Sequence, residues 1–285
     1  MRKARSTFLP LLFSLPLLIV YVPFQLVPII GTILFSFVKP GGKLEFVFFD
    51  HINKLVSDTV IIKALSNNFI WIIFSMFVPV IIGLVAASLI GFIPKGRSIF
   101  RFLIFLPVPV AYAVIGAMWS PIYHPYFGLI NSVLRSTGLI NRPIIFLSPD
   151  LAIWSLLVVN IWGYYPLTTI IFLASLQKIP SELYESARVD GANVLQTFLH
   201  ITLPLLKPAI SFLLILIMLQ SVGVFDLIWI MTRGGPGHAT EVLGTWAYQQ
   251  AFLFFDYGYA CTISLLIAIV TLPVAIYMLV IRRGM

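Results

Sequence analysis

Polar side chains that could bind a ligand occur inside long apolar runs of this sequence. Asn160 and Tyr164 lie one helical turn apart in one run, and Gln220 and Ser221 are adjacent in a later one. Amides and hydroxyls beside an aromatic ring suit a polyhydroxylated ligand such as a sugar, because they supply hydrogen bonds and an apolar face. These four residues are our candidate substrate-binding residues. The alternative is that Asn160 and Gln220 form hydrogen bonds between helices.

Signatures of catalysis and of metal binding are absent from the sequence. The histidines are isolated and form no HExxH-type pair, so no metal site is expected. They are His51, His124, His200 and His238. No P-loop occurs, and no GxSxG or Ser/His/Asp arrangement is identifiable. We therefore predict that the chain is not an enzyme, that it binds no cofactor, and that any ATP hydrolysis takes place on another subunit.

The composition indicates an integral membrane protein. Of the 285 residues, 60% are hydrophobic and only 10% are charged, and such an apolar surface needs lipid as its solvent. The net charge of +8 does not indicate nucleic-acid binding, because the basic residues are scattered at the ends of apolar segments. Cys261 is the only cysteine, so no internal disulfide is possible.

Membrane-spanning helices must position the candidate residues, and each needs about 20 apolar residues. The runs without Asp, Glu, Lys or Arg are 6–38, 64–94, 102–134, 151–177, 208–225 and 257–281. The third run is too long for one helix, and its span should end near Ser120, before Pro121. The fifth continues past Asp226 to Thr232, and we expect Asp226 to have a structural or gating role. The sequence thus predicts an all-α protein with six transmembrane helices.

The distribution of basic residues predicts the orientation of these helices. Alternating crossings put both termini on the same side as the loops at 95–101 and 178–207. Eleven basic residues lie on that side and seven on the other, so both termini are expected in the cytoplasm. The first run is 33 residues long and exceeds a signal-peptide core, so we expect it to remain as a span. Its four prolines predict a kinked helix.

Three segments are expected on the outer side of the membrane. Residues 39–63 carry charges of both signs, which is typical of a solvated structure of a few helical turns. Residues 127–140 have apolar side chains at helical spacing, which predicts an amphipathic helix along the membrane surface. The Gly-Gly-Pro sequence at 234–236 predicts a tight turn, and an apolar, aromatic segment follows over 245–252.

A charged and amphipathic segment between the fourth and fifth spans is predicted to dock onto a partner. Ser181 is expected to cap a helix that Gly191 ends, and a second short helix should run from about residue 193 to residue 200. The apolar side of the first helix would be exposed to water unless a partner covered it. The alternative is that Glu185 and Arg188, three residues apart, form only a solvated pair.

This segment resembles the EAA motif in the permease subunits of bacterial ABC importers. The matching residues are Glu185, Ser186 (where alanine is usual), Ala187 and Gly191, followed by Ile201, Leu203 and Pro204. Tyr184, Asp190, Ala192, Phe198 and the Gly-Gly-Pro turn with Thr240 are similar to the branch that imports carbohydrates, the maltose, lactose and glycerol-phosphate class. The resemblance covers about 64–283.

The resemblance implies the type I importer permease fold, with a first helix and external loop over 1–63 and a core domain over 64–285. It implies a cytoplasmic coupling loop over 181–204 that transmits motion from an ATPase subunit. The residues implied in this coupling are Ser181, Glu182, Leu183, Tyr184, Glu185, Ala187, Arg188, Asp190, Gly191, Ala192 and Pro204.

The resemblance also implies partners and a place in the cell. The partners are a second homologous permease, two subunits that hold ATP and Mg, an extracytoplasmic sugar-binding protein and the lipid bilayer of the bacterial cytoplasmic membrane. The implied function is ATP-driven import of a carbohydrate, a di- or oligosaccharide or a related derivative, by alternating access. The alternative is a stand-alone secondary sugar transporter, but a single intramembrane carboxylate and the lack of a repeat argue against it.

Overall fold

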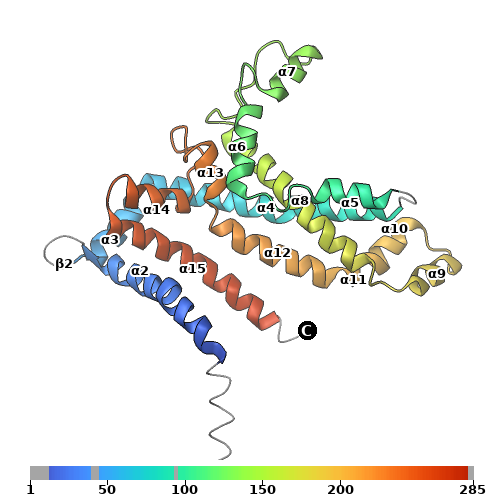
Figure 1. Cartoon of the computed structure of the whole chain (residues 1–285), viewed down its shortest axis with the longest axis horizontal. Coiled ribbons are helices and arrows are strands. Elements are labelled where there is room, and N and C mark those ends of the chain that lie inside the picture. Colours follow the sequence, from blue (N-terminus) through green and yellow to red (C-terminus); the bar gives the residue numbers. More distant parts are fainter. Residues whose placement is uncertain (1–12, 40–44, 93–95, 282–285) are drawn as a thin grey trace, which may run out of the picture. The chain divides into compact units, whose positions relative to one another are not determined.

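The computed structural model describes residues 13–39, 45–92 and 96–281, and these residues are almost entirely helical (Figure 1). The elements in chain order are η1 (Val22–Leu26), α2 (Val27–Phe37), β1 (Val38–Lys39), β2 (Glu45–Phe46), α3 (Phe48–Ser57), α4 (Thr59–Phe92), α5 (Arg97–Phe105), α6 (Tyr112–Ile122), α7 (Leu129–Ser136), α8 (Ala152–Leu176), α9 (Ser181–Val189), α10 (Val194–Thr197), η2 (Phe198–Thr202), α11 (Leu203–Leu205), α12 (Lys207–Val222), α13 (Asp226–Met231), α14 (Leu243–Phe252) and α15 (Tyr257–Ile281). The predicted helical class is confirmed.

By length and apolar composition, three of the described helices could cross a membrane: Phe13–Phe37, Thr59–Gly91 and Ala152–Leu176. A fourth crossing arises if Val194–Leu205 and Lys207–Val222, which meet at a bend of 62°, form one span. Tyr112–Ile122 and Tyr257–Pro273 are shorter apolar helices. The six-span topology therefore stays a prediction. The basic residues of the amino terminus, which count toward the predicted orientation, lie outside the described residues. So does Pro10, one of the four prolines that predict a kinked first helix.

The predicted third span, 102–120, is wrong as a single helix. α5 ends at Phe105 and α6 begins at Tyr112. Pro107 and Pro109 lie between them, and a proline has no backbone N–H with which to continue a helix. The fifth run is broken too, because α12 ends at Val222 and α13 starts a separate helix at Asp226.

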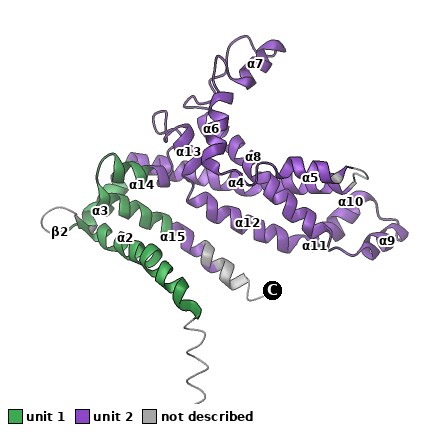
Figure 2. Ribbon diagram, in the orientation of Figure 1, with its two compact units in different colours: residues 1–58, 246–269 green, residues 59–245, 270–285 purple. Residues whose placement is uncertain are grey.

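The chain forms two compact units, 1–58 with 246–269 and 59–245 with 270–285 (Figure 2). Compactness alone does not decide how a chain divides into domains, so the division into 1–63 and 64–285 stays a prediction. In the first unit, β1 and β2 pair antiparallel, with Val38 opposite Phe46. The predicted few turns within 39–63 are present as α3, where the buried His51 places Nδ1 3.0 Å from the backbone oxygen of Ser36.

In the second unit, the most extensive helix contact joins α4 and α8. Gly83 makes this contact possible, because a Cβ atom there would lie 2.0 Å from Oγ1 of Thr168. The same Thr168 hydroxyl donates a hydrogen bond of 2.7 Å to the carbonyl oxygen of Pro79. Farther along the same pair of helices, Nδ2 of Asn160 donates to Oγ of Ser75 at 2.7 Å. Polar contacts thus fix the register of two otherwise apolar helices.

The loop between α13 and α14 is held by two asparagines of α4. Nδ2 of Asn67 donates to the backbone oxygens of Ala239 and Glu241, and Oδ1 of Asn68 accepts from the backbone N–H of Leu243. The predicted Gly-Gly-Pro turn is present here. Gly234 has φ +85°, and a Cβ atom at that position would meet the carboxylate of Glu241 at 2.4 Å. Hydrogen bonds between backbone groups of the loop and the side chains of Asn67 and Asn68 therefore hold the loop against α4.

Two segments agree with the sequence expectation in part. The amphipathic helix expected over 127–140 is α7, which is shorter than the expected segment and is followed by a turn at Gly138, φ +72°. Asn131 of α7 is buried, and its side-chain amide forms hydrogen bonds with both the N–H and the carbonyl oxygen of Ile144. These two bonds hold the segment that follows α7 against the helix. The apolar segment expected over 245–252 lies within α14.

Candidate functional site

All four candidate substrate-binding residues line one cavity of about 390 Å³ in the second unit. α8 contributes Asn160 and Tyr164, and α12 contributes Gln220 and Ser221. α4 packs against both of these helices. The other lining residues are Trp71, Tyr112, Gly223, Val224, Phe225, Asp226 and Leu227. The four candidate residues, which come from two apolar runs that are distant in the sequence, therefore line the same cavity.

Three of the four side chains have partners within the protein. The Tyr164 hydroxyl donates a hydrogen bond to Oε1 of Gln220, which joins α8 to α12. The Asn160 amide is occupied by Ser75, so the interhelical contact that was the alternative interpretation for this residue is present. Among the described residues, Ser221 Oγ is the buried side-chain oxygen that has no hydrogen-bond partner. A buried hydroxyl without a partner is costly, so Ser221 is the group with most to gain from a ligand.

Aromatic rings and one carboxylate complete the cavity wall. The rings of Tyr112 and Tyr164 lie 5.1 Å apart between centroids, and Trp71 is almost fully buried beside them. Asp226, at the start of α13, is the charged residue among the described lining residues. From the sequence, Asp226 is expected to have a structural or gating role and is not among the candidate substrate-binding residues. Sequence reasoning missed Trp71 and Tyr112, because their sequence surroundings resemble any apolar helix.

The segment 181–204, which is predicted to couple the permease to an ATPase subunit and is called the coupling segment below, has the two helices that the sequence predicts. α9 runs from Ser181 to Val189, and Gly191 follows with φ +79°, a left-handed conformation that glycine adopts without strain. The predicted Ser181 cap is wrong: Pro180 occupies the N-cap position with φ −58°, and no side chain caps the helix. The fixed φ of proline starts the helix one residue too early for the Ser181 hydroxyl to act as a cap.

A cap that sequence reasoning missed begins the second helix. Oδ1 of Asn193 accepts from the backbone N–H of Gln196 at 2.8 Å, and Oε1 of Gln196 accepts from the N–H of Asn193 at 2.9 Å. This reciprocal pair is a capping box, and the Asn-x-x-Gln spacing could have revealed it. The Tyr184 hydroxyl lies 3.2 Å from Oγ1 of Thr202, so the two halves of the segment are also connected side chain to side chain.

The outer surface of the coupling segment is apolar and exposed. Val189 is 88% exposed, Leu183 is also exposed, and Ala187 alone among the motif residues is buried. Within the described part of the chain, Glu185 and Arg188 form no ion pair, although they stand three residues apart. Exposed apolar residues beside an unpaired carboxylate are the kind of surface that a protein partner covers.

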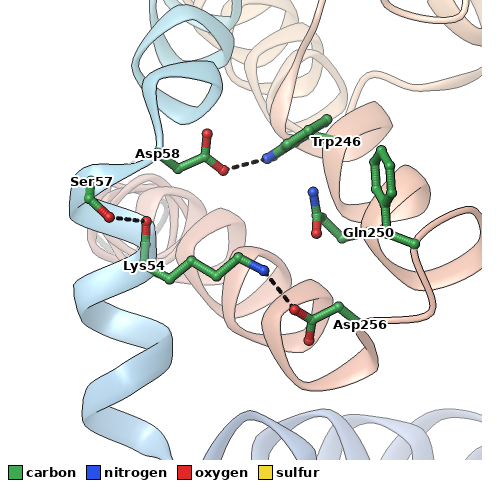
Figure 3. Close-up of a pocket in the computed structure, with 7 residues that line it drawn as sticks. Lys54, Ser57, Asp58, Trp246, Gln250 and Asp256 are labelled. Atoms are coloured by element: carbon green, nitrogen blue, oxygen red, sulfur yellow. Dashed lines mark hydrogen bonds and ion pairs between the residues drawn. The ribbon is translucent and has the colours of Figure 1, made fainter.

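A further pocket, of about 540 Å³, lies in the first unit (Figure 3). Lys54 reaches across it to Asp256, with 2.6 Å between Nζ and Oδ2, and Asp58 accepts from the indole N–H of Trp246 at 2.9 Å. The Tyr259 hydroxyl donates to the same Asp58 oxygen. Burial opposes charge on Asp256, but the hydrogen bonds from Lys54 and from the Tyr259 backbone N–H hold the pKa of this carboxyl below its ordinary value. These polar contacts tie α3 to α14 and α15 within the unit.

The sequence over residues 69–285 matches the family described as binding-protein-dependent transport system inner membrane component. The chain belongs to this family. It is therefore an inner membrane permease component, as the EAA-like segment predicted, and the resemblance stated from the sequence is confirmed.

Curated relatives of this permease match over nearly its whole length. A probable ABC transporter permease protein of Bacillus subtilis, YurN, is 33% identical over 95% of each chain. The trehalose/maltose transport system permease protein MalF of Thermococcus litoralis is 32% identical over 99% of this chain and 96% of its own. The diacetylchitobiose uptake system permease protein NgcF of Streptomyces coelicolor is 29% identical over 98% of this chain and 83% of its own.

Solved structures show the fold of the permease. A chain from a bacterial ABC transporter involved in the import of the acidic polysaccharide alginate superposes with a TM-score of 0.86 at 24% identity, over 100% of this chain and 98% of its own. A chain of the MetNI methionine ABC transporter superposes with a TM-score of 0.53 at 17% identity, over 79% of this chain and 95% of its own. The predicted importer permease fold is confirmed by these likenesses.

Proposed function

We propose that this permease is the transmembrane subunit of an ATP-driven ABC importer that moves a carbohydrate into the cytoplasm by alternating access. The observation that carries the proposal is the cavity between α8 and α12. Its lining combines amide and hydroxyl groups with aromatic rings, in the membrane part of an importer permease. Relatives named for trehalose, maltose and diacetylchitobiose transport support a carbohydrate as the solute.

The recognition step follows from the groups in the cavity. A sugar ring would stack its C–H face on an aromatic side chain, and its hydroxyls would bond to Gln220 and Ser221. The buried Ser221 hydroxyl has no hydrogen-bond partner among the described residues. A hydrogen bond from it to a sugar hydroxyl would therefore stabilise the bound state. Asp226, which lines the same cavity, can accept hydrogen bonds from two sugar hydroxyls. Transporters commonly place such sites near the middle of the bilayer.

The energy for transport would come from subunits outside this chain. We propose a second homologous permease, two ATPase subunits that hold ATP and Mg, and an extracytoplasmic sugar-binding protein as partners. A solved alginate ABC transporter in complex with an alginate pentasaccharide-bound periplasmic protein supports a partner of that last kind. We propose six spans with both termini in the cytoplasm, so that α9 and α10 face the ATPase subunits.

The coupling step is a shift between two states of the permease pair. ATP binding would close the ATPase dimer and move the coupling segment, and the connected spans would then open the cavity outward. ATP can drive this shift only through its differential affinity for the two states, and the segment is the mechanical link between them. A short connection joins α8 to α9, so motion at the segment would pass into α8, which carries Asn160 and Tyr164 in the cavity wall.

Reconstitution tests this function. The permease, its sister permease, the ATPase subunits and the binding protein are placed in proteoliposomes, and uptake of labelled trehalose, maltose and diacetylchitobiose is measured. We expect uptake of at least one sugar only with ATP and binding protein present. Uptake by the permease alone, driven by an ion gradient, would instead support the stand-alone secondary transporter.

A further inference from the structure

A pocket of about 720 Å³ lies behind the coupling segment and differs in character from the cavity between α8 and α12. Its walls come from the carboxyl-terminal ends of α4 and α8, from α5, and from α9 to η2. The lining is largely apolar, with Leu173, Leu176 and Phe198 among its residues. An apolar pocket of this size is suited to an apolar or amphipathic ligand.

The charges of the pocket have one sign. Arg101 of α5 and Arg188 of α9 both line it, and no acidic side chain is among the described residues of the lining. Within the described residues, neither arginine forms an ion pair. Hydroxyl groups of Tyr184 and Thr202 stand in the same wall. Two arginines in one lining, with no acidic side chain among its described residues, favour an anionic ligand such as a phosphate group.

α5 adds an independent indication that this pocket meets the lipid surface. This helix is short, and its apolar side chains face outward, with Ile99 at 65% and Phe102 at 66% exposure. In the proposed six-span topology α5 begins the third span on the cytoplasmic side, where an arginine near the end of a span extends toward the lipid headgroups. Arg101 would therefore lie near the level of the lipid headgroups, and the exposed apolar side chains of α5 would face the acyl chains.

We propose that this pocket binds one anionic phospholipid, whose phosphate lies between Arg101 and Arg188 and whose acyl chains cover the apolar wall. The lipid would connect α5 to α9, and so would hold the coupling segment against the ends of the spans. A phospholipid satisfies both features of the pocket, because its headgroup neutralises the arginines and its chains replace water on the apolar lining. This inference is independent of which solute the permease carries.

Lipid binding to the purified importer complex in detergent tests the proposal. Native mass spectrometry and thermal unfolding are followed while phosphatidylglycerol, phosphatidylcholine or inorganic phosphate is added. We expect phosphatidylglycerol to bind and to raise the unfolding midpoint, and phosphatidylcholine and phosphate to do neither. Arg101→Gln should weaken phosphatidylglycerol binding about fivefold, because one basic contact with the anionic headgroup is lost.

Lys178→Gln is the matched control, because Lys178 is an exposed cation in the same connecting region that does not line the pocket. It should leave phosphatidylglycerol binding unchanged. Equal weakening by Lys178→Gln would overturn the proposal in favour of general surface charge. Equal binding of phosphatidylcholine, full competition by inorganic phosphate, or lipid binding that appears only after the ATPase subunits are removed would each overturn it as well. The last result would assign the pocket to the ATPase subunit.

Discussion

The hydroxyl of Tyr164 on α8 donates a hydrogen bond to Oε1 of Gln220 on α12, and both residues line the cavity of about 390 Å³. The bond orients the Gln220 amide, since its oxygen is held by the tyrosine. Its Nε2 group forms no hydrogen bond among the described residues, so that donor is left for a ligand. A helix–helix contact and a ligand-binding group are thereby combined in one side chain.

Gln220→Ala should reduce uptake more than Tyr164→Phe does. The first change removes both the helix contact and the ligand donor, whereas the second removes only the contact. We expect the first variant to raise the apparent KM for the sugar by about five- to tenfold, the effect of one lost hydrogen bond. Uptake kinetics in proteoliposomes measure this, with co-purification of the ATPase subunit as the assembly control. Equal effects of the two changes would mean that the amide serves helix packing alone.

Ser221→Ala should weaken uptake without lowering stability. The Ser221 hydroxyl is buried and has no partner, so its removal relieves a desolvated polar group while it deletes a bond to the sugar. We expect an unfolding midpoint equal to or above that of the wild type, together with a KM raised about fivefold. Ser120→Ala is the matched control, because that hydroxyl bonds the Gly116 carbonyl of its own helix and does not line the cavity. An unchanged KM in Ser221→Ala would remove Ser221 from the site.

Asn160→Ala should destabilise the permease as well as slow transport. Asn160 is 2% exposed and donates to Ser75 on α4, so its removal leaves that buried serine without its partner. The expected loss is about 1–3 kcal/mol of unfolding free energy. Thermal unfolding in detergent checks this value, and uptake is normalised to the folded amount. Wild-type stability would show that the α4–α8 contact is not energetically important.

Glu185→Lys and Gly191→Asp should abolish uptake while the protein still inserts and pairs with its sister permease. The charge reversal acts on an exposed carboxylate of α9, and Gly191 has φ +79°, which costs another residue about 1–2 kcal/mol. A Cβ atom at Gly191 would meet nothing within 4 Å, so the strain comes from the backbone and not from a clash. Asp150→Lys, an exposed charge reversal outside the segment, is the control.

Two quantities decide the interpretation of the coupling variants: sugar uptake, and the ATPase subunit retained on the affinity-purified permease. Loss of uptake with the ATPase subunit retained would mean that the segment transmits motion without supplying most of the docking energy. Wild-type values of both would show that the segment is not the coupling element.

Acid should weaken the first unit through Asp256. Because the pKa of Asp256 is held below its ordinary value of 3.8, its ion pair with Lys54 contributes stability above that pH. The contribution is lost as the pH falls through the lower, folded-state pKa, since the protonated carboxyl no longer attracts the ammonium. Unfolding midpoints of wild type and Asp256→Asn, measured from pH 6 downward, should converge as the solution is acidified. A constant difference between them would contradict this.

The sequence alone determined the membrane character and the two short helices of the segment 181–204. An apolar run long enough to span a bilayer, and a charged helix followed by Gly191, are local patterns, because each depends on residues within a few turns of one another. The φ of Gly191 and the two helices around it are of this local kind. Pro107 and Pro109 are local signals of the same kind. The prediction of one helix for the third span is wrong because the length of an apolar run does not reveal the break at these prolines.

The contacts of the cavity were decided only by the tertiary structure. Tyr164 and Gln220 are 56 positions apart, and Asn160 and Ser75 are 85 apart. In helices that are apolar on every side, sequence periodicity does not tell which face meets which neighbour. Gly83, which lets α4 approach α8 at Thr168, sets that rotation through close packing. The packing pairs Asn160 with Ser75 and leaves Ser221 without a partner, because each helix can satisfy only the polar groups that its neighbours bring within hydrogen-bond distance.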